Sequence, residues 1–287
     1  MNDKKTATQK NVLAFGGGVD STALLALHLN RTAGAKLLGI SRRKLDKALP
    51  NFSAVVFSDP GAEFQHTYKN IEQARELCEK AGLEFVTVRR EGETITEWVK
   101  RLGIVPVMPG GPHVCSLKFK GEVMAKWASE SYGSADRVTW SVGIEHNEGA
   151  RVTRFTAKRG SKSQSVFPLV TLKIDRDQCR EIIAALWPIE VMKSSCVFCP
   201  FMQSHEIEDL TKCGDEFAIA LEVEDRFEQA SVEKNERWIQ NGRPLNKRGH
   251  APRGMWRVNS YASGARLFAK KVDGRQLSVR EWAEKVA

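Results

Sequence analysis

Short apolar runs alternate with amphipathic stretches over the first half of the chain. Runs typical of buried strands are NVLAF at 11–15, AVVFS at 54–58, EFVTV at 84–88 and RVTWSVGI at 137–144. Apolar residues recur at helical spacing over 22–29, 67–82, 117–133 and 175–187. Strands that alternate with helices predict an α/β fold, in which a doubly wound parallel sheet is covered by helices on both faces.

The pattern changes after about residue 156. The stretch 156–165 predicts a polar surface loop, 188–201 interrupts the helical pattern, and a helix is expected from there to about Phe227. The Gly-, Pro- and Arg-rich stretch 241–256 predicts another loop. We therefore expect a sheet domain over residues 1–160. A smaller, mainly helical region with a C-x2-C segment and a basic tail would follow over 161–287.

The first strand is followed by an unusual turn, within LAFGGGVDSTALL at 13–25. Three glycines leave the backbone N–H groups bare at the start of a helix, which favours an anion there. No lysine follows, as a Walker loop would require, and no third spaced glycine, as a dinucleotide fold would require. Asp20, Ser21 and Thr22 instead suit pyrophosphate held by N–H groups, with Mg²⁺ near Asp20. A purely structural glycine turn is the alternative.

Ligands of parallel sheets bind at the carboxyl ends of the strands. The stretches that follow three of the predicted strands are therefore candidate site segments. They are residues 16–21, 58–63 and 143–151.

Charge is unevenly distributed along the chain. The net charge is +9, and residues 1–225 hold 30 Lys and Arg against 29 Asp and Glu, whereas residues 226–287 hold 14 against 6. The basic C-terminal quarter suits a polyanion such as tRNA or DNA, and a solubilising surface is the alternative. The polar start and the lack of a long apolar run predict a cytoplasmic protein without a membrane segment.

Several motifs resemble those of the PP-loop ATP pyrophosphatases, in the branch of the phosphoadenosine phosphosulfate (PAPS) reductases. GGGVDS at 16–21 resembles the SGGxDS pyrophosphate loop, with Gly16 in place of serine. VVFSDPGAEFQHTY at 55–68 resembles D-T-G-x-E-F-x-x-T, with Pro60 in place of threonine. HVCSLKFK at 113–120 is similar to the cysteine-Ser/Thr-x-x-x-K element.

Two further motifs continue the resemblance in the same order. GIEHNEGARVTR at 143–154 resembles G-x-R-x-x-E-S-x-x-R, with Glu145 in place of arginine and Gly149 in place of serine. SSCVFCPF at 194–201 is similar to a cysteine pair found in many members of the branch. The matches together span residues 12 to about 210.

The resemblance implies a nucleotide α-hydrolase-type sheet that binds ATP over residues 1–160 and cleaves it between the α- and β-phosphates. It implies catalytic roles for Asp20, Ser21, Arg151 and Cys115, although an ion pair with Glu148 or Glu145 is the alternative for Arg151. The residues that it places around the nucleotide are Phe15, Gly16, Gly17, Gly18, Asp20, Ser21, Thr22, Ser58, Asp59, Gly143, Glu148 and Arg151.

Cysteine spacing suggests a metal centre. Without a secretory signal, the six cysteines are expected to be thiols or metal ligands. Cys196 and Cys199 form a C-x2-C pair that can bind one metal centre. Cys115, which lies in one of the resembling motifs, would add a third thiolate, and the resemblance to sulfur-inserting PP-loop enzymes implies that the open position of a [4Fe–4S] cluster carries sulfur. Cys213 as a fourth ligand would instead favour structural Zn²⁺ or a closed cluster. Reduced, buried thiols are the alternative to any metal.

Three functions remain open at this level. The first is an ATP-dependent adenylating sulfurtransferase that acts on a nucleic acid and takes sulfur from a cluster or from a donor protein such as a cysteine desulfurase. The second is a PAPS or adenylylsulfate reductase, against which no cysteine follows Cys213 and no adjacent cysteine pair occurs. The third is a nucleotide-binding subunit without activity.

Overall fold

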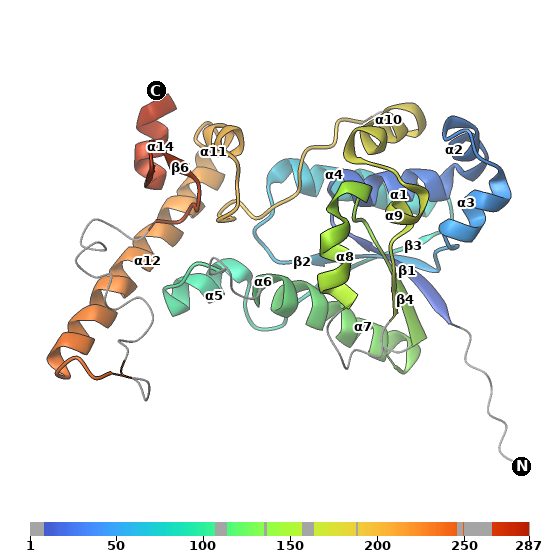
Figure 1. Ribbon diagram of the computed structural model, residues 1–287. Coiled ribbons are helices and arrows are strands. Elements are labelled where there is room, and N and C mark those ends of the chain that lie inside the picture. Colours follow the sequence, from blue (N-terminus) through green and yellow to red (C-terminus); the bar gives the residue numbers. More distant parts are fainter. Residues whose placement is uncertain are drawn as a thin grey trace, which may run out of the picture. The chain divides into compact units, whose positions relative to one another are not determined.

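The computed structural model describes residues 9–106, 114–134, 137–156, 164–187, 189–245, 249 and 266–286. The chain forms two compact units (Figure 1). The first consists of Met1–Asp59, Glu63–Arg90 and Lys118–Ser195. The second consists of Pro60–Ala62, Glu91–Leu117 and Cys196–Ala287.

A five-stranded parallel sheet, in the order β3-β2-β1-β4-β5, forms the centre of the first unit. The chain runs from β1 outward to β3 and then returns to place β4 on the other side of β1, so the direction of winding reverses between β1 and β4. This order confirms the predicted doubly wound parallel sheet. The strands are β1 (Lys10–Phe15), β2 (Ala54–Asp59), β3 (Glu84–Arg89), β4 (Val138–Val142) and the unpredicted β5 (Gln164–Val166).

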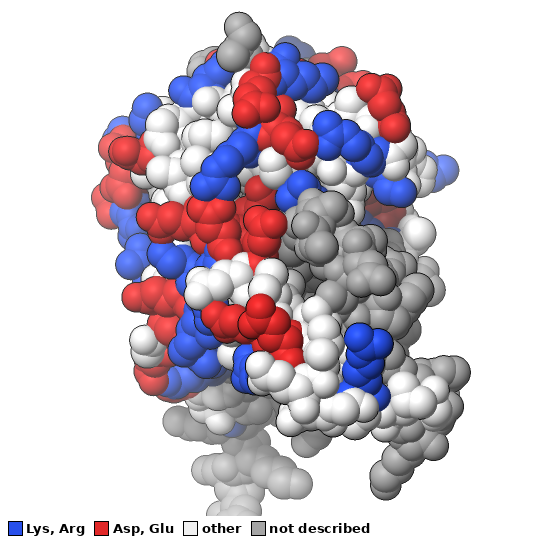
Figure 2. Space-filling model, turned by 90° about the vertical axis from the view of Figure 1, so that its left-hand side faces the viewer, with Lys and Arg blue, Asp and Glu red and all other residues white. Residues whose placement is uncertain are grey.

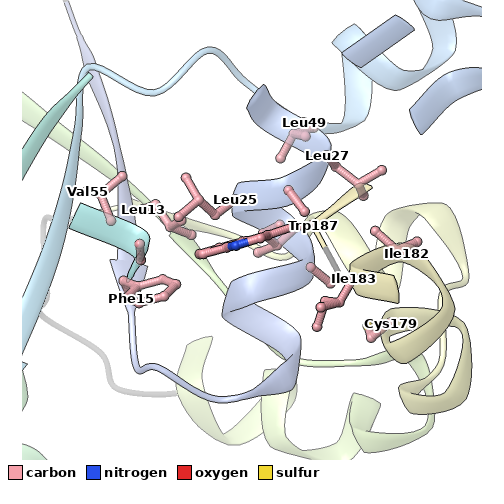
Figure 3. Close-up of a cluster of buried hydrophobic side chains, with 14 of the residues drawn as sticks. Leu13, Phe15, Leu25, Leu27, Leu49, Val55, Cys179, Ile182, Ile183 and Trp187 are labelled. Carbon is pink, nitrogen blue, oxygen red and sulfur yellow. The ribbon is translucent and has the colours of Figure 1, made fainter. Parts of the chain in front are cut away.

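Alternating side chains of the strands enter two separate cores. Leu13 and Phe15 of β1 face the larger core, and Val12 faces the smaller one. Figure 3 shows Leu13, Phe15 and Val55 of the sheet facing the side chains of α1 and of the segment around α10. The helices that contribute to the larger core are α1 (Val19–Leu29), α2 (Arg31–Leu37), α3 (Arg42–Ala48), α4 (Gln65–Lys80), α9 (Pro168–Leu172) and α10 (Arg176–Leu186).

The opposite face of the sheet is covered by α7 (Glu122–Tyr132), whose Ala128 is fully buried against Val138 and Trp140 of β4. A π-helical stretch, Leu117–Gly121, precedes α7. Two short helices, η3 (His146–Glu148) and α8 (Gly149–Thr156), follow β4. Both faces of the sheet are therefore closed, and its carboxyl edge at β1 and β4 remains the place for a ligand.

The second unit is mainly helical. Helix α5 (Ile95–Leu102) begins with a capping box between Thr94 and Glu97 and ends at Gly103. The long α12 (Gly214–Gln240) extends well beyond Phe227, where the sequence predicted an end. The other elements are α6 (Val114–Ser116), α11 (Ser204–Leu210), the hairpin β6 (Lys271–Val272) and β7 (Arg275–Gln276), and α14 (Val279–Val286).

The boundary between the units differs from the predicted one at residue 160. The first unit continues to Ser195, because β5 pairs with β4 and α10 packs against α1. The stretch Glu91–Leu117 leaves the first unit and joins the second. No helix in the described part of the chain is long and apolar enough to span a membrane.

Candidate functional site

The glycine loop, defined here as residues 16–22, joins β1 to α1 at the point where the winding of the sheet reverses. Gly17 has a φ of +71°, and a Cβ there would lie 2.9 Å from Thr67 Cγ2. Gly18 has an ordinary extended backbone, but a Cβ there would lie 2.7 Å from Ser194 Oγ. Two adjacent glycines are thus needed for different physical reasons.

Gly143, directly after β4, closes the loop from the other side. A Cβ on Gly143 would lie 2.7 Å from the backbone nitrogen of Ser21. Only a residue without a side chain lets the end of β4 approach the first turn of α1 so closely. The structure therefore brings Gly143, predicted as a site residue, against the glycine loop.

Side chains of the loop itself hold its shape. Ser21 Oγ donates to the carbonyl of Gly18 at 3.1 Å and accepts from the N–H of Gly16 at 3.2 Å. Thr22 Oγ1 donates to the same Gly18 carbonyl at 2.9 Å. Asn70 of α4 donates to the carbonyl of Gly17 and to Thr22 Oγ1. No side chain caps the N-terminus of α1, so the positive end of the helix dipole lies at the loop.

Asp20 lies in the first turn of α1 and is nearly buried. Its Oδ2 accepts from Arg176 Nη2 at 3.0 Å, and the same Nη2 lies 3.5 Å from Glu148 Oε1. Burial raises the pKa of the Asp20 carboxyl; Arg176 opposes this shift, whereas Glu148 and Glu145 add to it. The charges of α1, α10 and η3 thus meet at the carboxyl edge of the sheet.

Several buried polar atoms around this loop make no hydrogen bond. Native proteins satisfy most buried polar groups, so a local group of unsatisfied ones marks a place where a polar ligand or water can bind. In the described part of the first unit the unsatisfied side-chain atoms are Asp20 Oδ1, Glu63 Oε2, Thr67 Oγ1, Asn70 Oδ1, Ser141 Oγ and Arg176 Nε. Asp20, Thr67, Asn70 and Arg176 belong to the loop or to residues that contact it.

The residues predicted after β2 are fixed by protein groups. Ser58 Oγ donates to the carbonyl of Phe119 at 2.8 Å. Asp59 is nearly fully buried and accepts from the hydroxyl of Tyr68 and from Arg89 Nε, each at 2.8 Å. Their side chains therefore stabilise the carboxyl edge of β2 in this structure, and a contact with the nucleoside stays a prediction.

Arg151 and Arg176 show what the sequence pattern indicated and what it missed. Arg151 is exposed, and its guanidinium forms an ion pair with Glu148, which is the alternative weighed from the sequence. The cation that reaches Asp20 is Arg176, the first residue of α10. Arg176 follows β5 in the chain, and a strand of three residues is too short to be recognised from a hydrophobic pattern. The stretch that follows β5 is therefore not among the candidate site segments predicted from the sequence.

The four cysteines predicted as metal ligands all lie in the second unit. Cys196 and Cys199 flank a tight turn, in which the Cys199 N–H donates to the Cys196 carbonyl at 3.0 Å. Cys115 lies in α6, and Cys213 precedes α12 with its sulfur 3.4 Å from the Asp209 carbonyl oxygen. All six cysteines of the chain are thiols.

The described cysteines do not form the predicted cluster or zinc centre in this structure. Within the ranges that the structure describes, no three His, Cys, Asp or Glu side chains are grouped to hold a metal ion. The [4Fe–4S] cluster and Zn²⁺ therefore stay predictions, and no step of a mechanism is drawn through them.

Several described Lys and Arg side chains of the predicted basic tail form ion pairs with Asp or Glu of the same chain. Figure 2 shows Lys and Arg side chains interspersed with Asp and Glu on the face it presents. Four cations of the predicted tail, Lys247, Arg248, Arg253 and Arg257, lie outside the described residues. Nucleic-acid binding through residues 226–287 thus stays a prediction. The ion pairs observed are Arg226 with Glu233, Arg266 and Arg275 with Glu281, Arg280 with Asp225, and Lys285 with Glu208.

Comparison with known proteins adds little to this description. No protein-family model matches the chain. An uncharacterized protein of Methanocaldococcus jannaschii is 29% identical over 244 residues, a match that covers 80% of this chain. The chain spans 44% of the length of that relative.

Proposed function

We propose that this chain is an adenylating enzyme that binds ATP with its pyrophosphate on the glycine loop and cleaves the bond between the α- and β-phosphates. One observation carries the proposal. Buried polar atoms without partners lie around an uncapped helix N-terminus, to which the two glycines Gly18 and Gly143 add no side chain. An anion with several oxygens matches bare N–H groups at the positive end of a helix.

The proposed reaction uses the loop to stabilise the leaving group. An oxygen of the acceptor attacks the α-phosphorus and forms a new P–O bond. The bond to the bridging oxygen breaks, and pyrophosphate leaves with the electron pair. In this proposal the N–H groups of the first turn of α1 stabilise the negative charge that grows on pyrophosphate, since preorganised donors of this kind lower the barrier.

The surrounding charges fit a nucleotide bound with Mg²⁺. Asp20 Oδ1 is buried without a partner, and a carboxylate oxygen is the ligand that magnesium prefers. Magnesium would neutralise phosphate charge when bound. Arg176 pairs with Asp20 and Glu148, and Arg151 also pairs with Glu148, so two cations offset these two carboxylates and reduce the repulsion of an anion.

Sulfur insertion into a nucleic acid is the finer part of the proposal. An acceptor carbonyl that has been adenylated can be attacked by hydrosulfide. The new C–S bond then replaces the C–O bond, and AMP leaves with the oxygen. The two thiols of the Cys196–Cys199 turn are half-buried and close in sequence. We propose that one of them accepts sulfur as a persulfide from a donor persulfide, and that attack of the other thiol on its inner sulfur releases hydrosulfide and leaves a disulfide, which an external thiol reduces.

Product analysis tests the reaction. The full chain is incubated with α-labelled ATP and Mg²⁺, with bulk tRNA or sheared DNA as acceptor. Formation of AMP and pyrophosphate is expected, and ADP with phosphate would contradict the proposal. Sulfite formed from PAPS with thioredoxin would favour the reductase instead, and nucleotide binding without turnover would favour a non-catalytic subunit.

A matched pair of variants tests the place of binding. Gly143→Ala puts a methyl group against the Ser21 nitrogen, whereas Gly149→Ala meets nothing within 4 Å. Calorimetry with α,β-methylene-ATP should show at least a roughly tenfold loss of affinity for the first variant and about the wild-type value for the second. Wild-type protein that binds neither ATP nor this analogue would overturn the proposal.

A further inference from the structure

The segment between α10 and the cysteine turn passes directly over the glycine loop. Ser194 Oγ lies 2.7 Å from the place of a Cβ on Gly18, and the Ser194 backbone nitrogen lies 3.5 Å from it. The preceding residue is held as well, because His66 of α4 donates from Nε2 to the Lys193 carbonyl at 3.3 Å. The hydroxyl of Ser194 is thus positioned by its neighbours against the loop.

Gly18 shows how closely Ser194 approaches. Its φ of −92° and ψ of 174° are allowed for any residue, so its backbone does not require glycine. The nearest atom that a side chain at Gly18 would meet is Ser194 Oγ. The loop and Ser194 therefore form one packed arrangement, although they lie far apart in the sequence.

Gly16 shows what the loop lacks. Its Cβ position lies 4.0 Å from both Ser194 Oγ and Ser21 Oγ, which is ordinary van der Waals contact. A serine would fit at position 16 and would place a hydroxyl close to the hydroxyl of Ser194. Glycine at this position leaves the loop without a donor there, and Ser21 Oγ already donates to the Gly18 carbonyl.

We propose that Ser194 supplies this missing donor and binds the terminal phosphates of the nucleotide, as a further wall of the anion site. The inference rests on the proposed nucleotide binding and assigns it a residue from outside the loop. A hydroxyl donates one hydrogen bond, and a bond to a phosphate oxygen is strengthened by the charge. The second observation is Thr67 beside Gly17, which is 1% exposed and whose hydroxyl oxygen, a group that can donate to an anion, has no partner.

Reciprocal substitution tests the assignment. Affinity for α,β-methylene-ATP should fall about three- to tenfold in Ser194→Ala and should stay at the wild-type value in the neighbouring control Ser195→Ala. Adding Gly16→Ser to Ser194→Ala should restore most of the loss. Inorganic pyrophosphate should show the same pattern, and adenosine alone should bind all variants equally.

The outcomes separate this inference from the proposed function. Wild-type affinity in Ser194→Ala, or a loss that Gly16→Ser does not repair, would overturn the role of Ser194 and leave nucleotide binding intact. Absence of binding by the wild type would overturn both. Urea denaturation of each variant, expected to match the wild type, distinguishes loss of a donor from loss of the fold.

Discussion

Arg176 at the start of α10 donates to Asp20 in the first turn of α1 at 3.0 Å, and this pair joins two helices at the edge of the sheet where the winding reverses. The pair uses one oxygen and one nitrogen and leaves Asp20 Oδ1 and Arg176 Nε buried without partners. Glu148 shares the same guanidinium. The arginine therefore offsets part of the negative charge of two carboxylates beside a site proposed for an anion.

Removal of this cation should weaken both stability and nucleotide binding. We expect Arg176→Met to lower the free energy of unfolding by about 1–3 kcal/mol, since it leaves the nearly buried Asp20 unpaired. Nucleotide affinity should fall at least tenfold, because two carboxylates then face the phosphates, and Arg176→Lys should recover part of it.

The matched control lies on the same helix. Arg180 is exposed and pairs with the exposed Asp177 of the same helix, so Arg180→Met should change stability by less than about 0.5 kcal/mol and leave affinity unchanged. Urea denaturation and calorimetry measure both quantities. Wild-type affinity in Arg176→Met would contradict the neutralising role.

Local patterns explain what the sequence predicted correctly. The strands show as short apolar runs, and the glycine loop stands out because glycines have no side chains. Gly143 follows β4 at the expected edge of the sheet. The positions of Arg176 and Ser194 beside the loop were not predicted, because tertiary packing alone brings α10 and the segment after it there. Arg151 was predicted from its place in a motif, and in the structure its guanidinium forms an ion pair with Glu148.

His28 should make the protein less stable in mild acid. Its ring stacks on Phe52, and Nδ1 lies 3.0 Å from Arg31 Nη2. Burial, with the charge of Arg31 as a second cause, lowers the pKa of His28 from 6.5 to about 4. Between these two pH values the unfolded chain binds a proton that the folded chain does not. The contribution of His28 to the free energy of unfolding is therefore fully present above about pH 6.5 and is lost as the pH falls toward 4.

The change can be measured as the difference in unfolding free energy between pH 7.5 and pH 4.5. His28→Gln should reduce this difference by about 1–2 kcal/mol, since the partly exposed ring is also solvated by water. His205→Gln, which replaces an exposed histidine on α11, serves as the control. An unchanged pH dependence in His28→Gln would show that other groups cause the acid sensitivity.

Gly103 should be essential for packing in the second unit. It ends α5 with a φ of +57°, and a Cβ there would lie 2.1 Å from Ala230 Cβ of α12. Gly92 has a φ of +86° with nothing within 4 Å of its Cβ position. Both alanine variants carry the strain of a positive φ, so their difference isolates the clash between the helices.

We expect Gly103→Ala to cost about 1–3 kcal/mol more than Gly92→Ala in urea denaturation. An equal loss of unfolding free energy in the two variants would mean that α5 and α12 can move apart without loss of stability.

Glu224 should fasten the C-terminal segment to α12. It is almost fully buried, and its two oxygens accept from the N–H groups of Leu267 at 2.9 Å and Val279 at 2.7 Å. In Glu224→Gln one amide oxygen remains as acceptor, while the NH2 group faces a second donor. We expect a loss of about 1–3 kcal/mol and faster hydrogen exchange over residues 266–286.

The control is Glu222→Gln, which changes an exposed glutamate one half-turn away that pairs with Lys100. Its exchange rates should equal those of the wild type. Protection of residues 266–286 that persists in Glu224→Gln would refute the fastening role.

The strand order has a consequence for synthesis on the ribosome. The glycine loop is made within the first two dozen or so residues, but β1 becomes an inner strand flanked on both sides only when β4 joins it. Arg176 and Ser194 emerge later still, so a nascent chain that stops at residue 160 holds the loop with two of its contacts missing. We therefore expect the loop to reach its full ligand affinity only after the whole first unit has been translated.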